Sequence, residues 1–120
     1  MKITVIGLGY VGLPLARLFA TKYAVIGFDV NQNRIAELRN CNDKTLEVSE
    51  ELLKTLIISI NPHKKEKGLY FTADSEEIKD SNIYIVTVPT PVDKNNKPDF
   101  SPLYNASELV GKVLKKDDIV

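Results

Sequence analysis

The chain has 120 residues, of which 43% are hydrophobic and 27% are charged, a balance typical of one globular domain rather than of a disordered chain. Sixteen basic residues match sixteen acidic ones, so no net field favours nucleic acid or an anionic membrane as a partner. The single cysteine excludes an internal disulfide and a CxxC metal or redox site, and a cytoplasmic location is therefore expected. Glycines interrupt the apolar N-terminus, which argues against an export signal, and no apolar run is long enough to span a bilayer.

The first part of the chain alternates strand and helix patterns. Apolar, β-rich runs at 3–6 and 24–28 predict two buried strands of a parallel sheet. A helical period begins between them at Val11, and a second helix is expected after Asn31, whose side chain can cap it. The apolar stripes predicted to face inward are Val11, Leu15, Leu18 and Phe19 in the first helix, and Ile35 and Leu38 in the second.

The middle of the chain continues this alternation after an irregular polar segment at 40–48. Ser49 is predicted to cap a third helix that stops at Asn61-Pro62. Its stripe is made of Leu52, Leu53, Leu56, Ile57 and Ile60. A charged turn at 63–67 then leads to a short strand at 69–72.

The last third of the chain predicts two more strands. Asp74 and Glu77 form a capping-box pattern for a short helix that ends near Asp80. A buried strand at 83–88 precedes an irregular segment at 89–98, and Ser101-Pro102 opens the last helix. Its inward residues are predicted to be Leu103, Ala106, Val110, Val113 and Leu114. Residues 118–120 read as a strand that has only begun, so we expect a fragment of a longer protein.

Residues 7–12 read Gly7-Leu8-Gly9-Tyr10-Val11-Gly12, a G-x-G-x-x-G motif. The motif follows a predicted strand, opens a predicted helix and leads to a second strand closed by an acidic residue, which together favour a dinucleotide-binding turn. Gly7 permits the tight turn, Gly9 lets the backbone approach a pyrophosphate, and Gly12 lets the helix pack near the strand. The N–H groups of the helix's first turn then bind the anion.

Asp29 closes the second strand, where its carboxylate can accept hydrogen bonds from both ribose hydroxyls. This predicts NAD as the cofactor, bound at least tenfold more tightly than NADP, a difference of about 1.4 kcal/mol. Arg34 follows in the next helix and could receive a 2′-phosphate or stack on adenine. With Asp29 present we expect adenine and ribose contact; the alternative is an exposed helix charge.

Four other residues are of types that could serve a nucleotide site or catalysis: Thr90, Cys41, His63 and Tyr10. Thr90 closes the 83–88 strand within a proline-bracketed turn and offers a hydroxyl near the expected nicotinamide half, although a rigid turn without ligand is equally consistent. Cys41 and His63 lack neighbours that would activate them, and Tyr10 is expected to pack over the dinucleotide. The sequence therefore predicts no catalytic residue and no metal site.

Several motifs resemble the UDP-glucose/GDP-mannose dehydrogenase family over essentially the whole chain. They are residues 2–14, 26–31, 86–91, Pro98-Asp99 and 113–116, in the family's order. Val88-Pro89-Thr90-Pro91 is most similar to the UDP-N-acetylhexosamine 6-dehydrogenase branch. The resemblance implies a truncated, doubly wound Rossmann-type α/β sheet of about five strands, the last incomplete, with residues 1–120 as its N-terminal NAD-binding domain and the central helix and substrate domain absent.

The resemblance also implies what the parent protein does. It would oxidise the C6 alcohol of a UDP-sugar to a carboxylate with two NAD⁺, in polysaccharide biosynthesis, as a homo-oligomer. The family's cofactor contacts fall on Gly7, Gly9, Tyr10, Val11, Gly12, Asp29, Arg34 and Thr90. Its catalytic residues would lie beyond Val120, so the chain alone is expected to be inactive.

Two other classes remain open from the residues alone. The first is another dehydrogenase with this cofactor fold, of the 6-phosphogluconate or hydroxyacyl-CoA type. The proline-bracketed segment from Val88 to Pro98 argues against it. The second is a stand-alone nucleotide-binding module without catalysis of its own.

Overall fold

The computed structural model describes residues 1–63 and 65–120. Within them a single parallel sheet is formed by β1 (Lys2–Ile6), β2 (Ala24–Phe28), β3 (Gly68–Thr72) and β4 (Ile83–Val86). The strand order is β3-β2-β1-β4, so the chain winds outward from β1 in both directions. The predicted doubly wound α/β fold is confirmed, and its topological switch point lies between β1 and β4.

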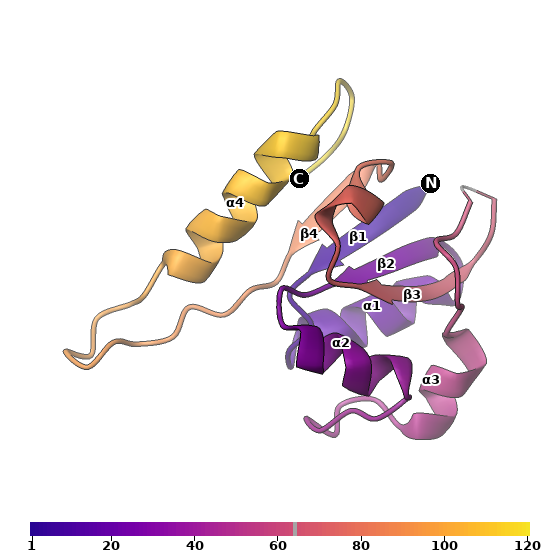
Figure 1. The fold of residues 1–120 in the computed structure, drawn as a ribbon, viewed down its shortest axis with the longest axis horizontal. Coiled ribbons are helices and arrows are strands. Elements are labelled where there is room, and N and C mark those ends of the chain that lie inside the picture. Colours follow the sequence, from indigo (N-terminus) through magenta and orange to yellow (C-terminus); the bar gives the residue numbers. More distant parts are fainter. Residues whose placement is uncertain (64) are drawn as a thin grey trace.

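Helices cover both faces of this sheet, as Figure 1 shows. One face carries α1 (Gly12–Ala20), α2 (Gln32–Arg39) and α3 (Glu50–Leu56), while the other carries the short 3₁₀ helix η1 (Ser75–Ile78) and α4 (Ser101–Val113). Every residue of β1 and β2 is buried, as expected for strands covered on both sides. No helix in the described part of the chain is long and apolar enough to cross a membrane.

The orientation predicted for α1 is only partly right: of its expected inward stripe, Phe19 packs against the core. The fully buried residues of α1 include Leu13, Ala16 and Ala20, whereas Val11 and Leu18 are 66% and 56% exposed. Small side chains on the inner face let the helix axis lie close to β1 and β2, and this close packing outweighs the larger apolar area of the outer stripe. The inner face of α1 is therefore set by side-chain size and not by hydrophobicity alone.

The helix predicted up to Asn61 is also too long. α3 ends at Leu56 and buries only Leu53 within its span. Ile57 instead forms an isolated parallel bridge with Leu69, and the N–H of Ile58 donates to the carbonyl of Leu69 at 2.9 Å. The free edge of β3 offers hydrogen bonds to β-branched residues that favour extended backbone, which ends the helix early. The charged turn predicted at 63–67 includes residue 64, which lies outside the described residues.

The capping-box prediction is half right. The Asp74 carboxylate accepts a hydrogen bond from the N–H of Glu76 at 2.9 Å and so caps η1. The Glu77 carboxylate does not return to the cap, because it accepts from the hydroxyls of Tyr70 at 2.7 Å and Thr72 at 2.6 Å. The cap on α2 is confirmed, since the Asn31 side chain accepts from the N–H groups of Asn33 and Arg34.

The C-terminal third follows its prediction with shorter elements. β4 ends at Val86, two residues earlier than expected, and the irregular segment that follows extends away from the sheet before α4 returns (Figure 1). α4 buries Ala106 and Val110, whereas Leu103 and Leu114, expected inside, are 39% and 45% exposed. Of the strand expected at 118–120, the structure contains one parallel bridge between Ile83 and Ile119.

The packing of α1 yields the first testable prediction. Ala16→Leu should destabilise the fold by roughly 1–3 kcal/mol, because the added side chain has no space between helix and sheet. Leu18→Ala, on the outer face, should change the free energy of unfolding by less than about 0.5 kcal/mol. Urea unfolding of both variants measures this difference, and equal effects would mean that the helix does not pack through its small residues.

Candidate functional site

The turn between β1 and α1 requires glycine at Gly7. Its φ is +96°, and a Cβ there would lie 2.9 Å from the backbone nitrogen of Val88. The N–H of Gly7 donates to the carbonyl of Phe28 at 2.9 Å. Gly7 therefore joins β1 to β2 and touches the chain that leaves β4.

Gly12 lies where the turn closes on itself. A Cβ at Gly12 would be 1.7 Å from the carbonyl oxygen of Gly7 and 2.4 Å from Oγ1 of Thr87. The Thr87 hydroxyl donates to that same carbonyl at 2.7 Å and also lies 3.1 Å from the carbonyl oxygen of Ile6. Thr87 thus holds the start of the turn against the first residue of α1.

Gly9 differs from the other two glycines, because a Cβ added there would meet no atom within 4 Å. Next to it, the backbone N–H groups of Tyr10, Val11 and Gly12 donate to no acceptor among the described residues. Tyr10 and Val11 are 69% and 66% exposed. The loop therefore presents open backbone donors at the positive end of a helix, the arrangement that binds phosphate groups.

Asp29 is held at the end of β2 by two backbone donors. Its Oδ2 accepts from the N–H of Leu8 at 3.0 Å, and its Oδ1 accepts from the N–H of Asn31 at 2.9 Å. Each carboxylate oxygen keeps a further lone pair that can accept a hydroxyl proton. The hydrogen bond from Leu8 ties the carboxylate to the glycine loop.

Arg34 reaches back from α2 to the glycine loop, and its side chain is only 12% exposed. The alternative of an exposed helix charge is therefore wrong. Its Nε donates to the carbonyl of Leu8 at 2.9 Å, and its Nη2 lies 2.9 Å from Oδ1 of Asp43. The guanidinium connects the loop after β1 to the irregular segment after α2.

Asp43 organises that irregular segment from inside, with its side chain fully buried. It accepts from the N–H and hydroxyl of Thr45 at 3.0 and 2.6 Å, and from the N–H groups of Glu47 and Val48 at 2.8 and 3.0 Å. Burial alone would raise the pKa of the Asp43 carboxyl, but these hydrogen bonds, together with the one from Arg34, outweigh burial and lower it.

Gly7, Gly9, Asp29 and Arg34 line a cavity of about 540 Å³ at the carboxyl ends of β1 and β2. The volume lies within the range of small-molecule sites. Its walls come from the glycine loop, the end of β2, the segment after β4 and the first half of α4. The lining residues include Gly7, Gly9, Asp29, Asn31, Arg34, Val88, Pro89, Pro102 and Asn105. The cavity therefore lies at the topological switch point, where such sheets bind ligands.

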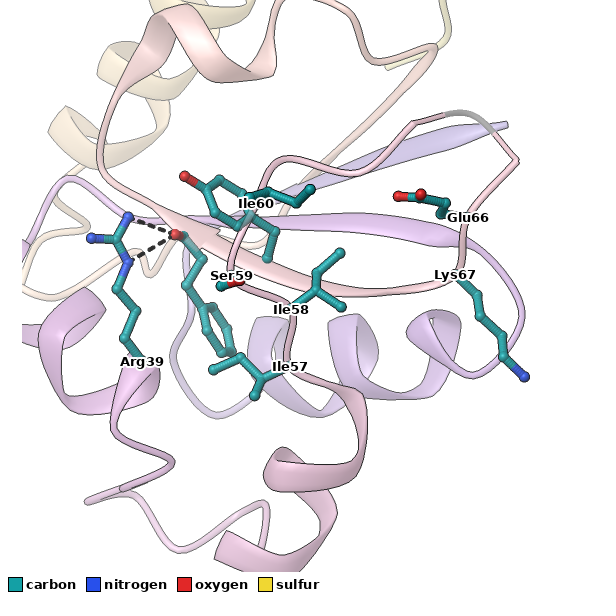
Figure 2. A pocket seen from close by; sticks show the side chains of 9 residues that line it. Arg39, Ile57, Ile58, Ser59, Ile60, Glu66 and Lys67 are labelled. Atoms are coloured by element: carbon teal, nitrogen blue, oxygen red, sulfur yellow. Dashed lines mark hydrogen bonds between the residues drawn. The ribbon is translucent and has the colours of Figure 1, made fainter.

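A second cavity, of about 960 Å³, lies at the free edge of β3 (Figure 2). Its walls are mainly isoleucine side chains after α3, and Arg39 closes one end by donating from Nε and Nη2 to the carbonyl of Phe71 at 3.1 and 2.9 Å. None of the residues predicted to bind the cofactor lines this cavity. We therefore place the candidate site at the smaller cavity.

Four residues predicted to bind the cofactor do not line the smaller cavity: Tyr10, Val11 and Gly12, which follow Gly9 in the same loop, and Thr90. Thr90 is exposed and follows Pro89, which does line it. Cys41 is buried after α2 and His63 is exposed in the segment before β3, so neither contacts the site. Among the described residues no group of three His, Cys, Asp or Glu side chains could hold a metal ion.

Sequence reasoning missed two positioning residues, Thr87 and Asp43. The apolar run at 83–88 predicts that Thr87 lies inside a strand, which gives its hydroxyl no evident role, whereas β4 ends at Val86. Asp43 lies in a segment interpreted as irregular, although its side chain bonds the backbone two residues on, as aspartate often does in turns. The sequence feature that indicates a turn at Asp43 is its spacing of two residues from Thr45.

Comparisons with known proteins agree with a dinucleotide site in this chain. The NAD-binding domain model of the UDP-glucose/GDP-mannose dehydrogenase family matches residues 1–120. The chain is 51% identical over 120 residues to a UDP-N-acetyl-D-glucosamine 6-dehydrogenase of Pseudomonas aeruginosa, covering all of this chain and 26% of the relative. It is 49% identical to the Salmonella typhi enzyme of the same name, with the same coverage.

A solved structure supports the same assignment. The UDP-D-ManNAc dehydrogenase of Pyrococcus horikoshii superposes with a TM-score of 0.79 at 31% identity, covering 99% of this chain and 27% of that one. The chain thus spans about a quarter of the length of these relatives. The whole-chain family match argues against the hydroxyacyl-CoA and stand-alone alternatives.

The lowered pKa of Asp43 yields a second prediction. Asp43→Asn should cost roughly 2 kcal/mol at pH 7, because the ionised carboxylate accepts several buried hydrogen bonds. For an acid whose pKa is lowered on folding, this contribution is present above the unfolded-state value of about 3.9 and is lost as pH falls through the folded value. The gap between wild type and variant in urea unfolding should therefore narrow below about pH 4. A gap independent of pH would contradict this role.

Proposed function

Because the chain belongs to the UDP-glucose/GDP-mannose dehydrogenase family and matches its NAD-binding domain, we propose that the cavity at the switch point is its NAD⁺ site. The observation that carries this proposal is the row of open N–H groups at the start of α1, beside a cavity that also holds the Asp29 carboxylate. The residues fit a dinucleotide, since Gly9 leaves room for a pyrophosphate against the backbone.

Each predicted residue has a place in this proposal. The pyrophosphate would lie on Gly7, Gly9, Tyr10, Val11 and Gly12, the adenosine ribose at Asp29 and the adenine beside Arg34. The nicotinamide half would then point toward the segment after β4, with Thr90 at its rim. When bound, NAD⁺ supplies a hydride acceptor; the residues here bind it, orient it and shield it from water.

For the whole protein we propose oxidation of the C6 alcohol of a UDP-N-acetylhexosamine to a carboxylate. The support is the identity of about half the residues to UDP-N-acetyl-D-glucosamine 6-dehydrogenases across the chain. A role in polysaccharide biosynthesis and a cytoplasmic location follow as proposals from the same resemblance and from the single, free cysteine. The homo-oligomeric state stays a prediction.

A substitution at Gly9 tests the cofactor site. Gly9→Val should weaken NAD⁺ binding at least tenfold, because the side chain would occupy the space needed by the pyrophosphate. The fold should persist, since a Cβ at Gly9 meets no atom within 4 Å. Gly111→Val is the matched control, because Gly111 on α4 is equally open and does not line the cavity. Titration calorimetry and urea unfolding measure both effects, and unchanged affinity in folded Gly9→Val would refute the placement.

The residues 1–120 alone should show no dehydrogenase activity. Removing a hydride from an alcohol requires a base for the hydroxyl proton, and trapping an aldehyde requires a nucleophile. The one cysteine, Cys41, is buried away from the cavity. The test follows NADH absorbance with UDP-glucose, UDP-N-acetylglucosamine, UDP-N-acetylgalactosamine or UDP-N-acetylmannosamine. Sustained turnover that disappears in Cys41→Ser would contradict the prediction.

A further inference from the structure

The Arg34 side chain bears on whether the site binds NAD⁺ or NADP⁺. Its guanidinium lines the cavity, and so does Asp29 at the end of β2. An arginine beside the adenosine ribose is the residue type that receives the 2′-phosphate of NADP. Arg34 alone would therefore favour NADP⁺ over NAD⁺, unless its hydrogen-bond donors and its charge already interact with other groups of the protein.

The guanidinium is engaged on all three of its nitrogens. Nε donates to the carbonyl of Leu8 at 2.9 Å, and Nη2 contacts Oδ1 of Asp43 at 2.9 Å and the hydroxyl of Thr45 at 3.5 Å. Nη1 lies 3.7 Å from the Glu37 carboxylate. Moving toward a phosphate would break these contacts, and the shortest of them to a charged group is with Asp43.

Asp43 cannot follow the arginine, because its own position is fixed by the loop. Its buried carboxylate accepts four hydrogen bonds from Thr45, Glu47 and Val48 in addition to the contact with Arg34. Glu37 is less fixed: its side chain is 20% exposed and also pairs with Lys44 at 2.8 Å. Asp43 is therefore the residue that locks Arg34 in place.

The charges around the guanidinium also disfavour a 2′-phosphate. Asp29, Glu37 and Asp43 supply three negative charges, and Arg34 and Lys44 supply two positive ones. The group is net negative by one charge, so it repels a 2′-phosphate and leaves the neutral hydroxyl of NAD⁺ unaffected. Removal of the Asp43 charge would make the group neutral and release Arg34.

We infer that Asp43 is a specificity-determining residue of the dinucleotide site, which excludes NADP⁺ by holding Arg34 and cancelling its charge. Asp43 acts through Arg34 and is a positioning residue, since it does not line the cavity. The inference rests on the proposed NAD⁺ site and assigns to a buried side chain of the loop after α2 a selectivity that Asp29 would otherwise carry alone.

The test compares the ratio of the NADP⁺ and NAD⁺ dissociation constants in wild-type protein and in Asp43→Asn, by titration calorimetry. Wild type should bind NAD⁺ at least tenfold more tightly than NADP⁺. In Asp43→Asn the ratio should fall at least fivefold, through tighter NADP⁺ binding. Thr45→Val is the matched control: it removes the hydroxyl that donates to Asp43 at 2.6 Å and lies 3.5 Å from Nη2 of Arg34, but it leaves every charge in place, so its ratio should match that of wild type.

The outcomes separate this inference from the proposed function. Wild-type protein that binds neither nucleotide would refute the NAD⁺ site itself. Wild-type selectivity that persists unchanged in folded Asp43→Asn, or that falls equally in Thr45→Val, would refute the role of Asp43 alone. Should Asp43→Asn not fold, Glu37→Gln removes a charge from the exposed side of the same guanidinium, and an unchanged ratio there would overturn the electrostatic exclusion of NADP⁺.

Discussion

Gly12 lies so close to the carbonyl of Gly7 that a Cβ there would be 1.7 Å from the oxygen. This contact lets α1 begin directly after the end of β1, so the open N–H groups of its first turn follow Gly9, which lines the cavity. The close approach of α1 to the sheet continues along the helix, because the small residues Ala16 and Ala20 are fully buried against the strands. Without this close approach the anion-binding end of the helix would move away from the strands that carry Asp29.

The candidate site is consequently built mostly from backbone, and side chains serve to hold that backbone in place. Thr87 fixes the carbonyl of Gly7, Asp29 accepts from the N–H of Leu8, and Arg34 donates to the carbonyl of Leu8. Side chains from two distant segments, one at 29–34 and one at Thr87, thus converge on two residues of one turn. Such a loop is preorganised, which reduces the entropy that a ligand must overcome when it binds.

The parts of this fold that follow from local rules were predictable from the sequence. β2 was placed residue for residue, and the cap of α2 by Asn31 followed from its side-chain chemistry. Predictions failed where tertiary contacts compete with local preference. Ile57 pairs with Leu69 at the edge of β3 instead of continuing the helix. Leu18 is exposed because the small residues of α1 pack against the sheet. In the candidate site the glycines and Asp29 carry a sequence signature. Thr87 acts through a contact with residues 80 positions away, which local sequence does not reveal, and the turn spacing of Asp43 and Thr45 does not show that Asp43 also holds Arg34.

The hydrogen bond from Thr87 to Gly7 joins residues 80 positions apart, and this separation determines the order of assembly. Local contacts form first, whereas contacts across a long loop must wait for its closure. During synthesis the glycine motif leaves the ribosome early, yet its turn acquires its final shape only after β4 has paired beside β1. A nascent chain that ends before β4 therefore contains the whole motif without the finished binding site. Once the sheet is complete, a dinucleotide that binds only the folded state would stabilise the state that carries this long-range contact.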